Sequence, residues 1–204
     1  MRKQRRRFLF VGNHPCLDFV NTQMIVKGEL TDTLGGFEDL VSWLIQAKLL
    51  TASQAAIVKG ELNHEGVVSL FEQAKTLRAT FRVVAERVAA GRSIPDSAID
   101  TINQVLAQRP GYQELVRTKG RFKQRFHSLA PPPAALLTPL AEAASDLLIS
   151  GHFSLMKKCA NVSCILYFYD TTKNHTRNWC SMQICGNRMK VAAHYRRIRR
   201  KLQG

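Results

Sequence analysis

The chain has 204 residues, of which 45% are hydrophobic, so it can bury a substantial core and is not intrinsically disordered. No apolar run approaches the roughly 18–20 residues that cross a bilayer, and the apolar stretch after the basic start is too short for a secretory signal. We therefore expect a cytoplasmic protein with no membrane partner. The formal net charge of +15 points instead to an acidic or phosphate-bearing partner.

The positive charge lies at the two ends of the chain. Residues 1–7 carry five basic groups and no acid, and residues 155–204 carry eleven basic groups and one acid, Asp170. Residues 8–154 carry fourteen groups of each sign, so the middle of the chain is neutral. A merely solvated surface is the alternative, but clustered charge favours attraction to a polyanion, where each phosphate contact releases counterions.

The first half of the chain shows helical periodicity. Apolar residues at helical spacing predict a helix over residues 37–50, and Thr51 is placed to cap a second helix. A longer run with the same period predicts a helix over residues 65–90, which Gly91 ends. A further helix is expected to start at residues 93–95.

The second half of residues 8–150 shows patterns typical of a hairpin and of a helix. Apolar positions on either side of Lys119 and Gly120 predict a hairpin over residues 112–128, and three consecutive prolines stop it. Residues 134–150 return to helical spacing. We therefore expect residues 8–150 to form a mainly α domain with small β elements, an α+β fold.

The cysteines form a pattern that belongs to metal sites. Four of the five follow the spacing Cys-x4-Cys-x15-Cys-x4-Cys, at Cys159, Cys164, Cys180 and Cys185. Two close pairs separated by an insert suit one tetrahedral structural Zn²⁺, and a reducing compartment argues against disulfides. An iron–sulfur cluster and free or redox-active thiols are the alternatives. Cys16 stands alone and is expected to be a small buried hydrophobe.

Residues 155–204 are predicted to form a separate module around these cysteines. Residues 159–164 suit a metal-held knuckle, and residues 165–170 have the composition of a strand. Ser181 can cap a helix that carries Cys185. Five positions turn about 140° around an ideal helix, so Cys180 is expected just before the helix. Knuckle, hairpin and helix together predict a treble-clef-like finger that ends in a basic helix.

The final helix is predicted to have two faces. Its apolar residues should pack against the body: Ile184, Val191, Tyr195, Ile198 and Leu202. Its cations are candidates for contacts with phosphates and base edges: Arg188, Lys190, Arg196, Arg197, Arg199, Arg200 and Lys201. A solvated basic helix is the alternative. His175 and His194 lie near the cysteines, but we expect them to be surface residues rather than ligands.

Three polar residues near the start of the chain are candidates for a small-ligand pocket. His14, Asp18 and Asn21 lie among apolar neighbours. The alternative is that Asp18 and Asn21 satisfy buried backbone groups. The chain shows no nucleophile–base motif, phosphate loop or dinucleotide fingerprint, so we expect a protein that is not an enzyme.

Two segments resemble known families. Residues 179–188, Trp-Cys-Ser-Met-Gln-Ile-Cys-Gly-Asn-Arg, together with the knuckle at residues 159–164, resemble the signature of the CGNR zinc-finger family. Residues 17–22, Leu-Asp-Phe-Val-Asn-Thr, resemble the opening of the ABATE domain, which precedes this finger in bacterial proteins. The resemblance covers nearly the whole chain. It implies a zinc-binding, DNA-binding, stress-related transcription regulator whose four ligands are the four clustered cysteines.

The charge pattern and the resemblance give two classes of function. The first is a regulator that binds duplex DNA through residues 186–201, with a homodimer and a small-molecule effector of the N-terminal domain as further partners. The second is an RNA-associated or protein-interaction zinc module. A thiol redox switch that ejects zinc on oxidation is a third alternative.

Overall fold

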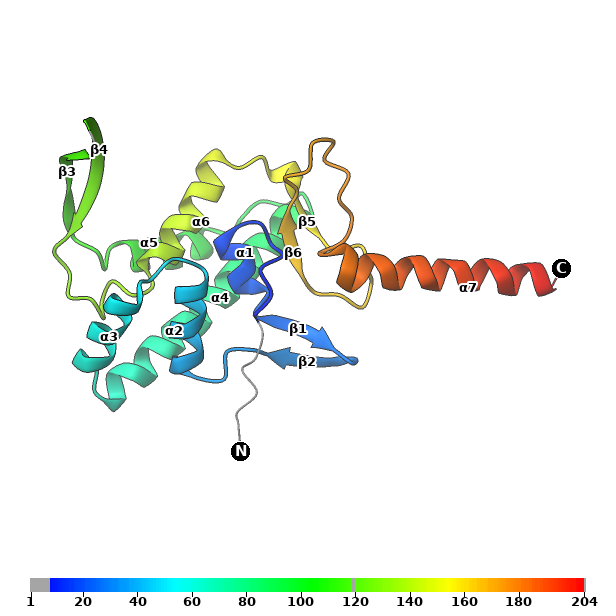
Figure 1. The fold of residues 1–204 in the computed structure, drawn as a ribbon, viewed down its shortest axis with the longest axis horizontal. Coiled ribbons are helices and arrows are strands. Elements are labelled where there is room, and N and C mark those ends of the chain that lie inside the picture. The colour runs from blue at the N-terminus through cyan, green and yellow to red at the C-terminus, as the bar shows by residue number, and fades with distance from the viewer. Residues whose placement is uncertain (1–7, 119, 204) are drawn as a thin grey trace.

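The computed structural model describes residues 8–118 and 120–203, apart from the side chains of Ser128, Arg197 and residues 200–203. The predicted basic segment 1–7 and Lys119 of the predicted turn lie outside this description. The described chain is mainly helical with three small antiparallel sheets, which confirms the expected fold class. Figure 1 shows a helical body from which a long C-terminal helix extends.

The body is built around the long helix α4 (His64–Ala89). Its inward face repeats every three or four residues and is buried: Leu70, Ala74, Leu77, Phe81, Val84, Ala85 and Val88. The other body helices surround it: α1 (Pro15–Val20), α2 (Phe37–Gln46), α3 (Ala52–Glu61), α5 (Asp96–Leu106) and α6 (Thr138–Ser150). Apolar side chains from all of these helices form one continuous core, as the helical periodicity predicts.

Two predicted helix boundaries are confirmed by their capping geometry. The Thr51 side chain accepts a hydrogen bond from the Gln54 N–H at 3.2 Å, and the Gln54 side chain accepts one from the Thr51 N–H at 2.9 Å, which completes a capping box. Gly91 follows α4 with φ +64°, a conformation that favours glycine. Helix α6 begins at Thr138, four positions later than predicted, because the turns that follow the proline run extend to Leu137.

The body carries two hairpins. Strands β3 (Gly111–Thr118) and β4 (Arg121–Ser128) pair with Thr118 opposite Arg121, as predicted for this segment. A second hairpin, of β1 (Gln23–Val26) and β2 (Glu29–Asp32), was not predicted. Its two-residue turn has positive φ at both Lys27 (53°) and Gly28 (90°), the geometry that matches the twist of paired strands.

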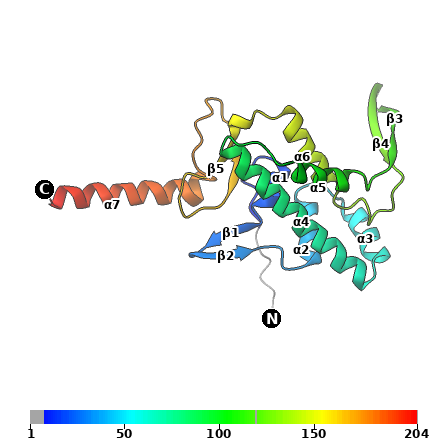
Figure 2. The same ribbon diagram turned by 180° about the vertical axis from the view of Figure 1, so that it is seen from behind.

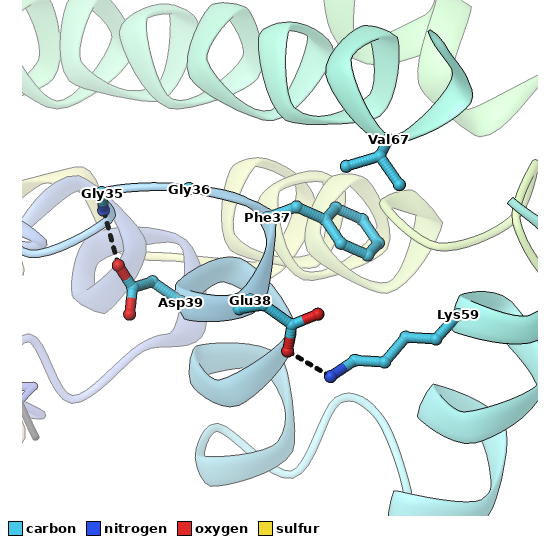
Figure 3. Close-up of a pocket in the computed structure, with 7 residues that line it drawn as sticks. All are labelled: Gly35, Gly36, Phe37, Glu38, Asp39, Lys59 and Val67. Atoms are coloured by element: carbon cyan, nitrogen blue, oxygen red, sulfur yellow. Dashed lines mark hydrogen bonds and ion pairs between the residues drawn. The ribbon is translucent and has the colours of Figure 1, made fainter. Parts of the chain in front are cut away.

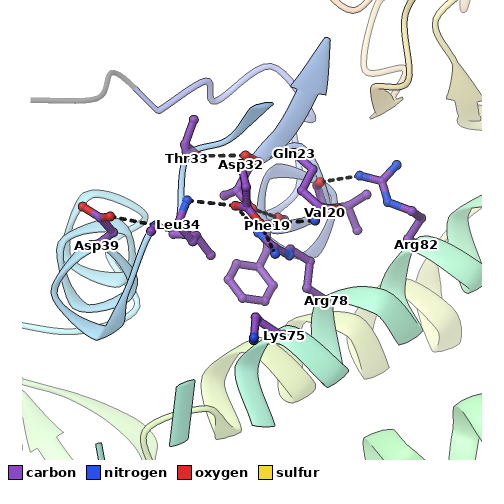
Figure 4. A network of polar contacts seen from close by, with 12 residues as sticks. Phe19, Val20, Gln23, Asp32, Thr33, Leu34, Asp39, Lys75, Arg78 and Arg82 are labelled. Carbon is purple, nitrogen blue, oxygen red and sulfur yellow. Dashed lines mark hydrogen bonds and ion pairs between the residues drawn. The ribbon is translucent and has the colours of Figure 1, made fainter. Parts of the chain in front are cut away.

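An ion pair ties the β1–β2 hairpin to α4 (Figure 4). The buried Arg78 guanidinium donates to both carboxylate oxygens of Asp32, at 2.8 and 2.5 Å, and to the Thr22 hydroxyl at 2.8 Å. Burial alone would raise the pKa of Asp32, but this two-pronged contact with Arg78 holds it below its usual value. The pair therefore stabilises the fold while Asp32 is ionised.

We predict that Asp32→Asn lowers the free energy of unfolding at pH 7 by about 2–3 kcal/mol, because the buried Arg78 loses its counter-charge. The pKa of Asp32 is lowered on folding, so its contribution is present above the unfolded pKa and is lost as the pH falls below it. Urea titrations should show the two proteins converging as the pH falls below about 4. The exposed Glu29→Gln on the same strand is the control; an Asp32→Asn protein as stable as this control at pH 7 contradicts the assignment.

The third sheet, β5 (Met156–Lys158) and β6 (Tyr167–Tyr169), belongs to two cores at once. Met156 and Tyr167 are buried in the core of the body. Phe168 is buried in a second, smaller core with the four clustered cysteines, against which Leu9, Val11 and Met24 of the N-terminal segment also pack. The C-terminal module is therefore packed onto the body through this hairpin.

Candidate metal centre

The four clustered cysteines meet at one buried point. The sulfur atoms of Cys159, Cys164, Cys180 and Cys185 all lie within 4.8 Å of one another. The Cys164 and Cys180 sulfurs are 3.8 Å apart, which is the edge of a sulfur tetrahedron with a metal–sulfur distance of about 2.3 Å. A disulfide would need about 2.05 Å. The donor set fits one structural zinc ion, as the cysteine spacing predicted.

Backbone hydrogen bonds form the knuckle that presents the first two ligands. The N–H of Cys159 donates to the carbonyl of Leu166 at 2.9 Å, and the N–H of Cys164 donates to the carbonyl of Asn161 at 2.8 Å. The buried Asn161 side chain accepts from the N–H of Ser163 and contacts the Cys185 sulfur at 3.4 Å. Because β5 precedes the knuckle and β6 follows it, the finger's hairpin forms across the knuckle rather than after it.

A wide helical turn presents the other two ligands. Ser181 caps it: its hydroxyl accepts from the N–H of Gln183, and its carbonyl accepts from the N–H groups of Cys185 and Gly186, both at 3.0 Å. Bonds that span five residues make Met182–Gly186 a π-turn, which continues into α7 (Asn187–Gln203). Cys180 therefore lies just before the helix, as the angular argument predicted.

Gly186 ends this turn beside the side chains of Met182 and Trp179. A Cβ atom added there would lie 2.6 Å from the Met182 sulfur and 3.5 Å from the ring of Trp179. The sequence pattern predicts no role for Gly186 beyond its place in a family signature. Because Met182 is a flexible, 45% exposed side chain that can move aside, this packing does not by itself require glycine between the ligand Cys185 and the start of α7.

The thiols are electrostatically coupled. A hydrogen bond from Cys164 lowers the pKa of Cys159, while hydrogen bonding to Cys159 raises the pKa of Cys164 and of Cys180. Four such groups cannot all ionise at this spacing without a cation, because like charges repel. A divalent ion removes this obstacle, so metal binding there releases protons.

Arg177 connects the ligand loop to the start of the body. Its guanidinium donates to the carbonyls of Val11 at 2.6 Å and Trp179 at 3.0 Å, and also to that of Cys180. It lies over the Phe168 ring, 4.1 Å from the centroid. No sequence pattern singled out Arg177, because its partners are carbonyl groups that any residue supplies.

Asp170, the single acid of the basic module, organises the loop between the ligand pairs. It is fully buried and accepts hydrogen bonds from Lys157 Nζ at 2.7 Å and from the N–H groups of Thr172 and Arg177, both at 3.0 Å. Burial would raise its pKa, but these donors hold the pKa well below its usual range. Its negative charge is therefore neutralised inside the module and does not offset the cations on the surface.

Asn21 attaches the body to the finger. Its side chain donates to the carbonyl of Tyr167 at 2.8 Å and accepts from the N–H of the same residue at 2.9 Å. Two positions along, the N–H of Tyr169 donates to the carbonyl of Gly12 at 2.8 Å, and the Asn13 side chain donates to the carbonyl of Tyr169 at 3.1 Å. These bonds act as an extra strand along the open edge of β6.

The predicted pocket residues lie on α1 or close to its ends, but the side chains of Asp18 and Asn21 are hydrogen-bonded to backbone groups. Asp18 accepts from the N–H of Gly12 at 2.6 Å, and burial raises its pKa to about 6. Asn21 holds β6, and His14 contacts the Cys16 sulfur at 3.2 Å. The oxygen atoms that the sequence offered to a small ligand are thus bonded to buried N–H groups.

A hollow lies at a different place in the body, between α2, α3 and the start of α4 (Figure 3). Its volume is about 420 Å³, and its lining is Gly35, Gly36, Phe37, Glu38, Asp39, Lys59 and Val67. An ion pair between Lys59 and Glu38 crosses it, and the N–H of Gly35 donates to Asp39 at 2.8 Å. These internal contacts already pair the polar groups of the hollow.

Helix α7 leaves the body, so one prediction about it is wrong. Both ribbon views show it extending away from the rest of the fold (Figures 1 and 2). Ile184 packs on the finger core, but Val191, Tyr195 and Ile198 are 55%, 67% and 41% exposed. The apolar stripe therefore does not face the body; periodicity shows that a helix has an apolar face but not what covers it. The side chain of Leu202 lies outside the description.

The predicted nucleic-acid residues lie on this extended helix. The side chains of Arg188, Lys190, Arg196 and Arg199 are exposed. Those of Arg197, Arg200 and Lys201 lie outside the described part of the chain. His194 contacts the ring of Tyr195, and His175 contacts the carbonyl of Asp170, so the structure places neither histidine in the cysteine cluster.

Comparisons with known proteins match two family models along the chain. Residues 13–151 match the ABATE family model, described as "Putative stress-induced transcription regulator". Residues 156–198 match the model of the CGNR zinc finger. No curated protein matches the chain. None of the helices in the described residues is long and apolar enough to cross a membrane.

We predict that Cys185→Ser abolishes stoichiometric zinc binding, because three thiolates cannot close the tetrahedral site. Elemental analysis of the purified protein should fall from one zinc per chain to near zero, and hydrogen exchange should speed up in Asn187–Gln203. Cys16→Ala, which removes the cysteine outside the cluster, should retain the metal. A metal-free protein with an equally protected α7 would refute the site's structural role.

We predict that Asn21→Ala loosens the finger without removing its zinc. The buried N–H and C=O of Tyr167 would each lose a partner at a cost of about 1–3 kcal/mol, so the free energy of unfolding should fall by about 2–4 kcal/mol. Limited proteolysis within residues 165–178 should accelerate. The exposed Asn103→Ala should change stability by less than about 0.5 kcal/mol; equal behaviour of the two variants would show that Asn21 does not fasten β6.

Proposed function

Because the chain belongs to the ABATE family and carries a CGNR zinc finger, we propose that it is a transcription regulator that binds duplex DNA through α7. It acts by binding rather than by catalysis, with a cytoplasmic location as the corollary. The observation that carries the proposal is a zinc-anchored cationic helix that stands clear of the body (Figures 1 and 2).

The shape of α7 suits a DNA groove. A helix with its side chains is about 10–12 Å wide, and the major groove of B-DNA is about 12 Å wide. The 17 residues of α7 extend about 25 Å. Because the helix leaves the fold, a duplex can approach it without meeting the body.

The charge of the module suits phosphates. Residues 155–204 carry eleven cations and one acid, and that acid, Asp170, is buried against Lys157. The described cations of α7, Arg188, Lys190, Arg196 and Arg199, are exposed. The field around α7 is therefore positive, and it draws a polyanion to this helix.

The metal makes this binding conditional on an ordered finger. The π-turn that starts α7 contains the ligand Cys185, and Cys180 lies just before it. The zinc ion thus fixes the origin of the helix relative to the knuckle and β6. The body reaches the same strand through Asn21, which is the route by which a signal sensed in the body would reach the finger.

A homodimer remains a prediction. Val191, Tyr195 and Ile198 follow spacings of four and three residues, which suit a seam between two helices. The cations around this stripe would repel those of a second α7, so we expect pairing of two such helices only where phosphates neutralise them.

The test compares two double variants that each remove two charges. Arg196→Gln with Arg199→Gln should weaken binding to a duplex of about 20 base pairs roughly tenfold and reduce the slope of log K against log salt by about 2, one for each lost phosphate contact. Fluorescence anisotropy at several salt concentrations measures both quantities. Chelation of zinc should abolish the same binding.

The control is Lys48→Gln with Arg92→Gln, which removes two exposed cations from the body. It should bind as the unaltered protein does. Equal binding by the helix variant and this control would refute the role of α7. Tighter binding to structured RNA than to duplex DNA at equal salt would favour the RNA-associated module instead. Selection from a random duplex library would then identify the preferred site.

A further inference from the structure

We propose that the β3–β4 hairpin (Gly111–Ser128), here called the ribbon, is a second nucleic-acid contact surface that allows one chain to hold two duplex segments. The inference rests on the proposed function only in taking duplex DNA as the partner. The ribbon lies at the end of the body opposite α7 (Figures 1 and 2). The two surfaces therefore face separate stretches of DNA.

The ribbon carries a cluster of positive charge that the net charge of residues 8–154 does not reveal. It contains one acid, Glu114, and five cations: Arg117, Lys119, Arg121, Lys123 and Arg125. The rest of residues 8–154 carries nine basic and thirteen acidic groups. The neutral middle of the chain is thus an acidic body with one strongly basic projection. Polyanions are drawn to such a projection and repelled by the remainder.

The strand register places three of these cations on one face. Arg121, Lys123 and Arg125 occupy alternate positions of β4, opposite Thr118, Val116 and Glu114 of β3. Alternate residues point to the same side and are about 6.8 Å apart along the strand. Arg125 pairs with Glu114 at 2.9 Å. Among the described residues, Arg121 and Lys123 have no acidic partner, so their charge is available to a ligand.

The ribbon is also unusually exposed. In the described part of the chain it forms a sheet of two strands only, with both outer edges unpaired. Two-stranded hairpins are marginally stable by themselves in water. Its contact with the body is at the base, where Arg109 covers the Phe126 ring at 4.2 Å. A surface of this kind suits an element that is completed by a partner.

The opposite face of the ribbon carries exposed aromatic and apolar side chains next to a further cation, Arg117. Phe122 near the turn is 60% exposed and carries the Arg117 guanidinium 4.8 Å from its ring centroid; Leu115 is 68% exposed. Arginine contacts phosphates and guanine edges, and apolar side chains such as phenylalanine contact thymine methyl groups in the major groove. The ribbon thus offers a duplex both phosphate contacts and an apolar contact.

Duplex DNA fits the ribbon better than a second copy of the chain does. A two-stranded ribbon is one of the two elements that the major groove admits. Antiparallel pairing of β4 with its copy would bring the cations of two identical strands together, and facing like charges destabilise a sheet. Charge complementarity therefore selects the polyanion.

The test uses the full-length zinc-loaded protein and two duplexes, one labelled with a donor and one with an acceptor fluorophore. The unaltered chain should bring the duplexes together and produce energy transfer. Arg121→Gln with Lys123→Gln should lower this transfer roughly tenfold at moderate salt and reduce the salt slope of binding by about 2. The single variant Arg121→Lys, which keeps the positive charge and leaves Lys123 unaltered, should retain most of the energy transfer.

Lys48→Gln with Arg92→Gln is again the control; unchanged zinc content and an unchanged urea unfolding midpoint show that the finger and the body of the ribbon variant are folded. A ribbon variant that matches this control in both transfer and salt slope overturns the proposal. If the ribbon variant has a reduced salt slope but the unaltered protein gives no energy transfer, the ribbon contacts DNA but one chain does not hold two duplex segments. If the ribbon variant loses DNA binding while the Arg196→Gln, Arg199→Gln variant binds normally, the role of α7 is refuted and the role of the ribbon is retained.

Discussion

The meeting of four sulfur atoms at one buried point is the constraint on which the C-terminal module depends. The knuckle and the π-turn come from segments that are separated by a long polar loop, and the zinc ion joins them. Without a cation, four thiols within 4.8 Å would oppose one another's ionisation. With it, the origin of α7 is fixed by metal bonds rather than by a large core, which a module of this size cannot supply.

The finger is not an independent appendage, because β6 belongs to the body as much as to the metal site. Tyr167 is buried in the body core, whereas the next residue, Phe168, is buried beside the cysteines. Asn21 bonds both backbone groups of Tyr167, and Arg177 reaches back to Val11. A change in the packing of α1 would therefore be felt at the strand that follows the knuckle. This gives the body a physical means of influencing the finger.

Charge is distributed so that the two proposed binding surfaces are separated from the body. Asp170 and Asp32 are each neutralised by a cation, Lys157 and Arg78 respectively. The described cations of α7 and of the ribbon instead face solvent on elements that project from opposite ends of the fold (Figure 1). The remainder of residues 8–154 carries more acids than cations and would repel a polyanion, in keeping with the proposal that DNA attaches at the two projections.

The sequence by itself determined the zinc ligands, the α+β class, the β3–β4 hairpin and the helix that follows Ser181, because spacing, periodicity and capping are local properties. It could not assign Asn21 to β6, since the two partners lie 146 positions apart and any backbone offers the same hydrogen bonds. It also placed the stripe of α7 against the body, although Tyr195 faces solvent. Periodicity encodes that a face is apolar, whereas what covers that face is decided only when distant segments pack together.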